Sequence, residues 1–124
     1  MGMSIDDFGG GPSAAAGVLV VTTNDIPGRR VTEVIGEVFG LTVRSRNLGS
    51  QIGSGIKSMF GGELRGLTKT LAESRAQAVE RLMEQARARG ANAVLAMRYE
   101  VSTADFGTEV CAYGTAVRLA DADS

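Results

Sequence analysis

The sequence contains no histidine and no tryptophan, a single cysteine, and only 5% aromatic residues. Because histidine is the usual general base beside a nucleophilic serine or cysteine, its absence argues against that kind of catalysis. The single cysteine, Cys111, excludes an internal disulfide, and an intrachain zinc site would need several cysteines or histidines. With so few aromatics, the core has to be built from Val, Leu, Ile, Ala and Met.

An excess of one charge is also lacking, since 13 basic residues face 14 acidic ones and the net charge is −1. Such a chain has no field that would attract nucleic acid or an anionic membrane surface. No apolar run approaches the roughly 20 residues of a membrane span. Residues 1–17 have neither the basic nor the apolar region of a secretory signal. We therefore expect no nucleic-acid partner, no membrane span, and a reduced, cytoplasmic setting.

What is present fits one domain. A chain of 124 residues with 44% apolar residues has room for one modest core. We expect residues 1–17 to form a flexible N-terminal tail, residues 18–119 to form the domain, and residues 120–124 to form a short C-terminal tail.

Two strands are predicted in the first half of the domain. Val18–Val21 is a mostly β-branched run, and a longer strand covers residues 31–46. Between them, Pro27 and Gly28 suit the second and third positions of a type II turn, which predicts a hairpin.

Glycines carry two further signals. Gly36 and Gly40 lie on the same face of the longer strand, which predicts a bend or the close approach of another backbone. The glycine-rich stretch from Asn47 to Gly66 is expected to form a helical turn or two followed by a loop.

The clearest element is a helix from about Leu67 to Arg89, closed by Gly90 in the left-handed conformation that is common after a helix. Strands over residues 93–101 and 110–119, joined by a hairpin loop, follow it. The order is therefore β-β-α-β-β, and we expect an α+β fold with an antiparallel four-stranded sheet. One arc of the helix is apolar and is predicted to be buried: Leu67, Leu71, Ala78, Val79, Leu82, Met83 and Ala86.

The first, third and fourth strands are apolar at both odd and even positions, so both faces of the sheet need cover. One helix covers one face, and a bare second face would exceed the apolar patch that soluble monomers expose. We therefore expect self-association with closed symmetry. The alternative is that the glycine-rich segment with Ile52, Ile56 and Phe60 folds back over the second face.

Two features of the sequence resemble functional motifs but lack residues that those motifs require. Gly49–Ser58 looks like a phosphate loop, but Ile56 separates Gly55 from Lys57, where the motif needs Gly-Lys-Ser in direct sequence. We expect a structural loop whose backbone amides can still bind an anion. Cys111 is expected to be a small core residue of the last strand. The alternative is a metal site made by copies of Cys111 around a symmetry axis.

Arg75 is the most informative single charge. It lies in the middle of the apolar arc of the helix, where a charge is costly unless it is paired. The hypothesis is a buried or interfacial ion pair with Glu33, Glu63 or Glu109. The alternative is that the stem of Arg75 packs on the core while its head reaches the rim.

Four polar residues are candidates for a ligand site at a subunit junction: Arg44, Arg46, Asn47 and Lys57. They would line a polar cleft beside the glycine-rich loop. The alternative is that they are ordinary solvated charges at the end of a strand.

Five segments occur in a fixed order: Thr22–Gly28, Arg44–Gly49, Lys57–Leu64, Gly90–Val94 and Ala112–Val117. Together they resemble the YbjQ-like family over essentially Val18 to Leu119. The resemblance implies a dodecin-subunit-like α+β fold assembled as a homopentamer. The heavy-metal-binding label of that family implies a metal cofactor, but this chain lacks the soft ligands such a name requires. The family supplies no catalytic residues.

Two functions remain open. The first is a non-enzymatic, homo-oligomeric binding module that holds a metal or a small anion at a subunit junction. The second is a structural ring that presents its N-terminal tails to a protein partner. An enzyme ranks third, because without histidine catalysis would fall to Glu33, Glu63 or Glu109 with an arginine or lysine, and no spacing selects a pair.

Overall fold

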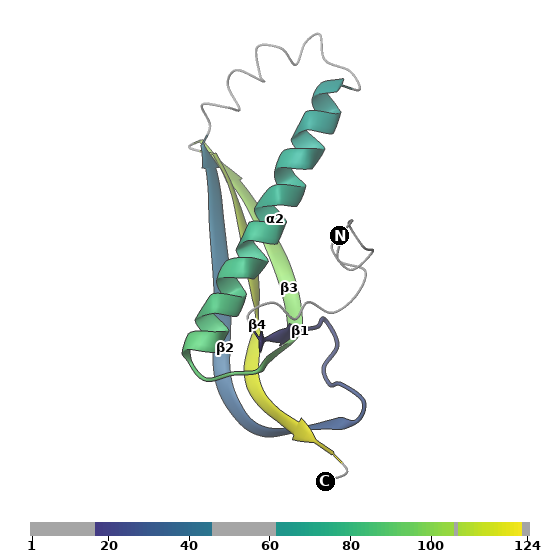
Figure 1. Cartoon of the computed structure of the whole chain (residues 1–124). Helices are drawn as coiled ribbons and strands as arrows, with labels where there is room; N and C mark the ends of the chain where they lie inside the picture. Colours follow the sequence, from purple (N-terminus) through teal and green to yellow (C-terminus); the bar gives the residue numbers. More distant parts are fainter. Residues whose placement is uncertain (1–16, 46–61, 106, 123–124) are drawn as a thin grey trace.

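A long helix lies across one face of a four-stranded sheet in the computed structural model, which describes residues 17–45, 62–105 and 107–122 (Figure 1). The elements follow one another as β1 (Leu19–Val20), β2 (Arg29–Ser45), α2 (Gly62–Ala88), β3 (Ala93–Ala104) and β4 (Gly107–Asp121). The predicted α+β class and the β-β-α-β-β order are confirmed. The predicted N-terminal tail up to residue 16 and the glycine-rich segment up to residue 61, including its predicted helical turn, lie outside the described residues.

The sheet is mixed, with the strand order β1-β3-β4-β2. β2 and β3 both run antiparallel to β4, whereas β1 pairs parallel with β3. The prediction of an antiparallel sheet is therefore wrong for β1. The predicted hairpin between the first two strands is also wrong, because β1 and β2 lie at opposite edges of the sheet.

The turn between β1 and β2 has the geometry expected from its sequence, although it does not close a hairpin. The amide of Arg29 donates to the carbonyl of Ile26 at 3.1 Å, and Gly28 adopts a φ of 81°. The turn redirects the chain toward the far edge of the sheet. Before the turn, the segment from β1 packs Leu19, Val21 and Ile26 against the sheet face opposite α2. Burial of these side chains explains why the segment crosses that face.

Both glycine predictions for β2 are confirmed. Gly36 has a φ of 135° and lies at an irregularity in the register between β2 and β4. Gly40 lies directly under the helix, where an added Cβ would collide with the carbonyl oxygen of Ala78 and the amide nitrogen of Leu82. A side chain at position 40 would therefore separate α2 from the sheet.

The C-terminal end of α2 is closed as predicted. Gly90 has a φ of 89°, and its amide donates to the carbonyl of Arg87 at 3.0 Å. The amide of Ala91 donates to the carbonyl of Ala86, also at 3.0 Å, which completes a Schellman motif. Within the described residues, no helix is long and apolar enough to cross a membrane.

The start of α2 differs from the prediction, since the helix begins at Gly62 rather than near Leu67. The predicted buried arc is confirmed for Ala78, Val79, Leu82, Met83 and Ala86. It is wrong for Leu71, which is 41% exposed, because the N-terminal half of α2 diverges from the sheet (Figure 1).

Two clusters of buried side chains lie on opposite faces of the sheet. The larger one fills the space between α2 and the sheet and includes Val38, Leu82, Val94 and Val110. The smaller one comprises Ala93, Leu95, Val117 and Leu119, and the crossing segment from β1 covers it. The second face of the sheet is therefore covered by its own chain at one end.

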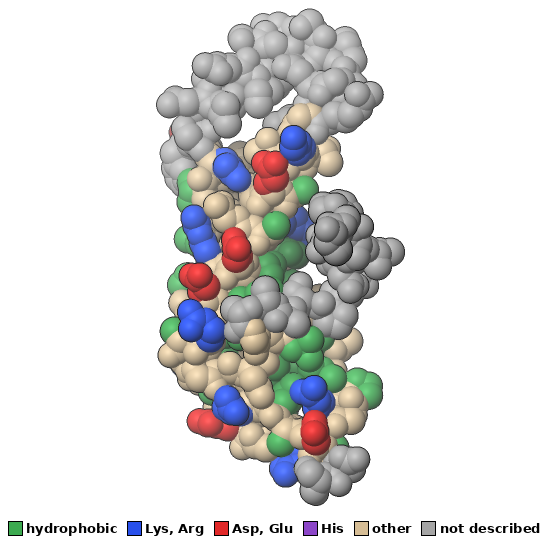
Figure 2. Space-filling model, viewed as in Figure 1, with side chains coloured by type: hydrophobic (Ala, Val, Ile, Leu, Met, Phe, Trp, Pro, Cys, Tyr) green, Lys and Arg blue, Asp and Glu red, His purple; other side chains and the backbone are tan. Residues whose placement is uncertain are grey.

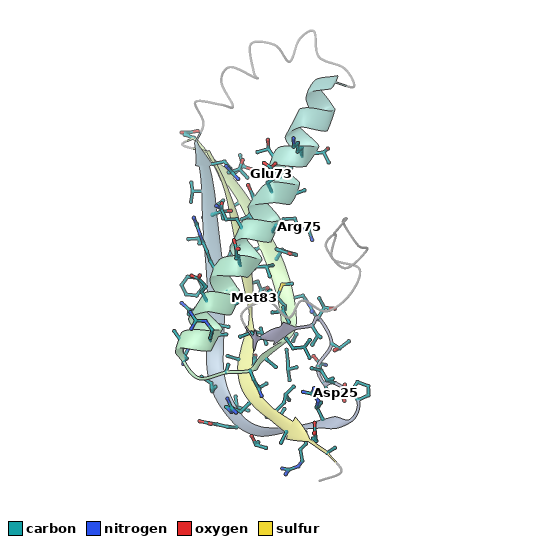
Figure 3. The ribbon with its side chains drawn as sticks, in the orientation of Figure 1. Asp25, Glu73, Arg75 and Met83 are labelled. Atoms are coloured by element: carbon teal, nitrogen blue, oxygen red, sulfur yellow. The ribbon has the colours of Figure 1, made fainter. Side chains whose placement is uncertain are left out.

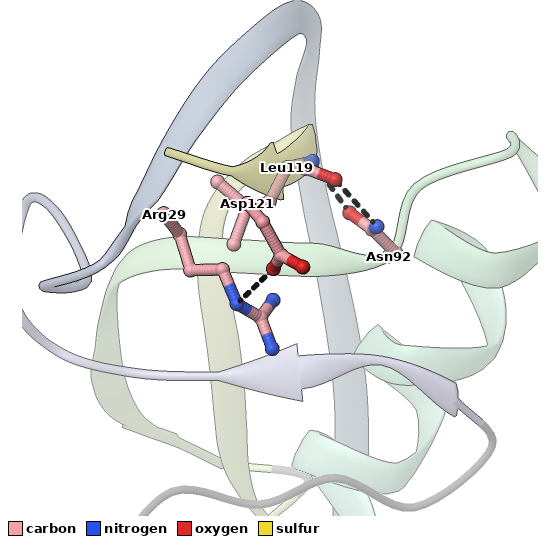
Figure 4. A network of polar contacts seen from close by, with 4 residues as sticks. All are labelled: Arg29, Asn92, Leu119 and Asp121. Atoms are coloured by element: carbon pink, nitrogen blue, oxygen red, sulfur yellow. Dashed lines mark hydrogen bonds and ion pairs between the residues drawn. The ribbon is translucent and has the colours of Figure 1, made fainter. Parts of the chain in front are cut away.

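Asn92 connects the end of α2 to β4 (Figure 4). Its side-chain amide donates to the carbonyl of Leu119 at 3.1 Å, and its side-chain oxygen accepts from the amide of Leu119 at 2.8 Å. Nearby, Arg29 and Asp121 form an ion pair at 3.3 Å whose side chains are 43% and 72% exposed. Such an exposed pair contributes little stability, so Asn92 is the main polar connection here.

Side chains of α2 cap the outer edge of β2. Arg89 donates to the carbonyls of Ile35 and Glu37, and Gln85 accepts from the amide of Phe39 at 2.8 Å. Arg81 donates to the carbonyl of Leu41. Because these three carbonyls and this amide between residue 35 and residue 41 already have partners, an added strand would have to displace the side chains of α2 there.

Candidate functional site

The uncovered end of the second sheet face is apolar, and we call it the open face. It is formed by Phe39, Leu41, Val43, Cys111 and Tyr113. These residues alternate along β2 and β4 with side chains that pack under α2, so they point to the other side of the sheet. Phe39 is 47% exposed and Val43 is 53% exposed. The open face is therefore an apolar area without cover among the described residues.

The open face is hollowed into a pocket of about 550 Å³. Three glutamates stand around its apolar floor, so that the pocket is lined by Glu37, Phe39, Leu41, Glu100, Glu109, Cys111 and Tyr113. Among the described residues that line it there is no lysine and no arginine. Arg98 belongs to the same face, but its guanidinium donates to the carbonyls of Thr22 and Met97. The described lining of the pocket therefore combines aromatic rings with negative charge and no positive charge.

Cys111 is one of the residues that line this pocket. Burial raises the pKa of its thiol above the ordinary value, and the charges of Glu109, Glu100 and Glu37 raise it further. At neutral pH the thiol is therefore protonated, and a protonated thiol is a poor nucleophile and a poor metal ligand. The three carboxylates that would attract a cation thus also hold Cys111 in its less reactive form.

Replacing Glu109 with Gln is expected to speed the alkylation of Cys111 by iodoacetamide at pH 8. The substitution removes the largest of the three charge effects, so the pKa falls and the thiolate fraction rises by roughly twofold or more. Rates are followed by mass spectrometry at a protein concentration at which native mass spectrometry finds single subunits, so that a neighbouring copy does not shield the thiol. Glu33→Gln is the matched control, because Glu33 is exposed and is not one of the charges acting on Cys111. An unchanged rate in Glu109→Gln would contradict this account of the thiol.

The open face of one subunit does not provide a complete metal site. Within the described residues, no group of three or more Cys, Asp or Glu side chains is arranged to hold a metal ion. Cys111 and the three glutamates line one pocket, yet they do not converge on one point. A metal held here would need additional donors from beyond the described residues that line the pocket.

Arg75 is exposed rather than buried, because its part of α2 has left the sheet. Its guanidinium lies 4.0 Å from the centre of the Tyr99 ring, and Figure 3 shows Arg75 on the side of the helix toward β3. Among the described residues Arg75 forms no ion pair, so the predicted pairs with Glu33 and Glu109 are not formed within one subunit. The side chain of Glu63 lies outside the described residues.

Arg44 connects β2 to the helix. Its Nε donates to the hydroxyl of Ser74 at 2.8 Å, and the Thr42 hydroxyl donates to the carbonyl of Ser74 at 3.3 Å. Ser74 is fully buried, so this arrangement satisfies its polar groups. Arg44 therefore has a structural role. The other residues predicted to line an anion cleft, Arg46, Asn47 and Lys57, lie outside the described residues.

The structure brings together only part of the predicted site. Glu109 and Cys111 share the pocket on the open face, whereas Glu33 lies near the other end of β2, opposite Arg118. Sequence reasoning missed Glu37, Glu100 and the aromatic floor. The period-two alternation of Glu37, Phe39 and Leu41 along β2 was a signal for part of this group. The contribution of Glu100 depends on strand pairing, which places it opposite Cys111.

A model of the family described as "Putative heavy-metal-binding" matches residues 18–120. A UPF0145 protein of Streptomyces griseus is 76% identical over 115 residues, which are 92% of this chain and 95% of the relative. A UPF0145 protein of Acidothermus cellulolyticus is 59% identical over 108 residues, 86% of this chain and 100% of the relative. UPF0145 protein YjfJ of Lactococcus lactis is 52% identical over 102 residues, 82% of this chain and 94% of the relative.

The fold is also similar to a crystal structure of a protein of unknown function from Pediococcus pentosaceus, which belongs to the DUF74 family. The TM-score is 0.49 with 12% sequence identity, over 84% of this chain and 99% of that one. None of these names states an activity, and the metal in the family description is the one ligand that any of them mentions.

Proposed function

The chain belongs to the YbjQ family, and from that premise we propose that it is a homopentameric binding module that holds a cation at the junctions between its subunits. The heavy-metal-binding description of the family supplies a class of ligand and no mechanism. The proposal assigns both the assembly and the ligand to the open face.

The observation that carries this proposal is the composition of the open face. Exposed apolar side chains such as Phe39 and Val43 favour burial against another copy. The same face carries Glu37, Glu100 and Glu109, which cost free energy when covered unless a positive charge accompanies them. A copy that covers the open face therefore has to enclose a cation or bring one with it.

Donors from two subunits would remedy the incomplete metal site of one. The glutamate oxygens suit a divalent cation, and the protonated Cys111 is the weaker donor at neutral pH. Binding of a soft metal through Cys111 would release a proton, so it would strengthen as the pH rises. The anion alternative has less support, because Arg44 is already engaged by Ser74.

Closed rotational symmetry is the usual outcome when one chain covers its own apolar surface. The number of five subunits comes from the family resemblance. The strands that are apolar on both faces support self-association but do not determine the number of subunits. A ring of five would have five times the subunit mass of 12.9 kDa.

Native mass spectrometry and isothermal titration calorimetry test the two parts of this proposal separately. The spectrum is expected to give a pentamer at micromolar concentration. Titration with Cd²⁺, Zn²⁺ and Mn²⁺ is expected to show binding that Glu100→Gln weakens by about tenfold, or about 1.4 kcal/mol. Glu33→Gln is the matched control, and inorganic phosphate is the test of the anion alternative. A folded monomer would overturn the assembly, and a pentamer that takes phosphate but no metal would overturn the cation site.

A further inference from the structure

We propose that each junction joins two different surfaces, the open face of one subunit and a second surface on the next that contributes Arg75. This second surface is formed by Leu71, Arg75, Tyr99 and Val101, and we call it the α2–β3 surface. The inference rests on the proposed self-association, which it deepens by stating which surfaces meet.

The α2–β3 surface exists because the helix covers β2 and β4 more fully than β3. Arg75 stacks over Tyr99 at 4.0 Å and thereby connects the two elements. Leu71 precedes Arg75 by one helical turn, and Val101 follows Tyr99 on the same face of β3. Because α2 and β3 run in opposite directions, both residues extend the contact toward the same end (Figure 1). Leu71 is 41% exposed and Val101 is 54% exposed, so this surface also favours burial.

The negative charge of the open face determines which surface of another copy it can bind. If two open faces met, the three glutamates of one copy would face the same three glutamates of the other. Like charges brought together in a covered interface are strongly unfavourable. Arg75 offers the opposite sign, and it forms no ion pair among the described residues of its own subunit. Figure 2 shows that the outer side of α2 instead mixes acidic and basic groups, so it has no comparable preference.

Other surfaces fit less well. Along the outer edge of β2, side chains of α2 already bind the carbonyls of Glu37 and Leu41 and the amide of Phe39, so an added strand would have to displace them. The exposed valines Val31 and Val34 flank Glu33, whose carboxylate would meet the glutamates of the open face, and Arg118 opposite Glu33 already donates to the carbonyl of Gly90. Among the described residues that form it, the α2–β3 surface combines exposed apolar side chains with a positive charge and has no carboxylate.

The two surfaces lie on opposite sides of the sheet, so one subunit can use both at once. A contact between unlike surfaces passes from copy to copy and closes into a ring, whereas a contact between identical surfaces stops at a pair. A ring of five therefore requires unlike surfaces. One guanidinium against three carboxylates leaves the junction negative, which is compatible with a bound divalent cation.

The test blocks each surface separately in the full chain. Phe39→Asp places a carboxylate on the open face, and Val101→Asp places one beside Arg75. Each variant alone is expected to lose the wild-type oligomer in native mass spectrometry and analytical ultracentrifugation. An equimolar mixture is expected to give a 1:1 heterodimer, because the intact α2–β3 surface of the first variant can still bind the intact open face of the second. Val34→Asp is the matched control and is expected to keep the wild-type mass.

Each outcome separates this inference from the proposed function. If the wild type is a folded monomer, both fail. If the wild type assembles but Val101→Asp keeps its mass, or the mixture gives no heterodimer, the unlike-surface junction is wrong while self-association stands. Formation of the heterodimer itself shows that both variants are folded. If the mixture gives no heterodimer because Val101→Asp has lost its helical circular dichroism signal, Arg75→Glu takes its place as the variant of the α2–β3 surface. The same outcomes then support or contradict the unlike-surface junction.

Discussion

Replacing Gly40 with Ala is expected to destabilise the subunit by about 3 kcal/mol or more, at the upper end of what overpacking costs. The added methyl group would meet the backbone of α2 at Ala78 and Leu82, and a backbone cannot rotate away as a long side chain can. The helix would have to lift from β2. Since α2 contributes Leu82, Met83 and Ala86 to the larger core cluster, that movement would open the core.

Urea unfolding followed by circular dichroism measures the effect of Gly40→Ala. Gly66→Ala is the matched control, because Gly66 is an exposed helical glycine with nothing within 4 Å of an added Cβ. The same chemical change is expected to stabilise at Gly66 by about 0.5 to 1 kcal/mol, through helix propensity. Equal effects at both positions would show that the approach of α2 to β2 is looser than described.

Replacing Leu82 with Ala is expected to cost about 2 to 5 kcal/mol, the range for a fully buried leucine. Leu82 is 0% exposed and lies at the centre of the contact between α2 and the sheet. The loss combines the transfer free energy of the removed methyl groups with the cavity that stays behind. A close backbone approach at Gly40 limits collapse of the helix into that cavity.

Leu71→Ala is the matched control on the same helix, because Leu71 is 41% exposed. In the Phe39→Asp background, where association is expected to be lost, Leu71→Ala should cost less than about 1 kcal/mol. Both substitutions are compared by urea unfolding in that background, so that assembly does not contribute to the free energy. A large cost for Leu71→Ala there would mean that the N-terminal half of α2 packs on its own subunit.

Most of the secondary structure could be predicted from the local periodicity of apolar residues in the sequence. The arc of Ala78, Val79, Leu82 and Met83 could be read from the sequence because the helical repeat is a local property. The closing role of Gly90 was equally local. Leu71 follows the same repeat but is exposed, because the divergence of α2 from the sheet depends on contacts far away in the chain.

The candidate site was less predictable than the fold. Cys111 and Glu109 were recognisable by residue type, whereas Glu37 and Glu100 join them only because β2 and β3 both pair with β4. Arg75 was singled out correctly as a charge on an apolar arc, but its neighbour Tyr99 comes from a different element.

The sequence by itself determined the order of the elements, the two glycine features of β2 and the excess of apolar strand surface over what one helix can cover. Only the tertiary structure decided that β1 runs parallel to β3 and that the crossing segment covers one end of the second face. The physical reason is that strand pairing, and the packing of a segment over a face of the sheet, bring together residues that are far apart in the chain. A local repeat in the sequence does not indicate which of these residues will be in contact. The acidic pocket around Cys111 is a product of that pairing.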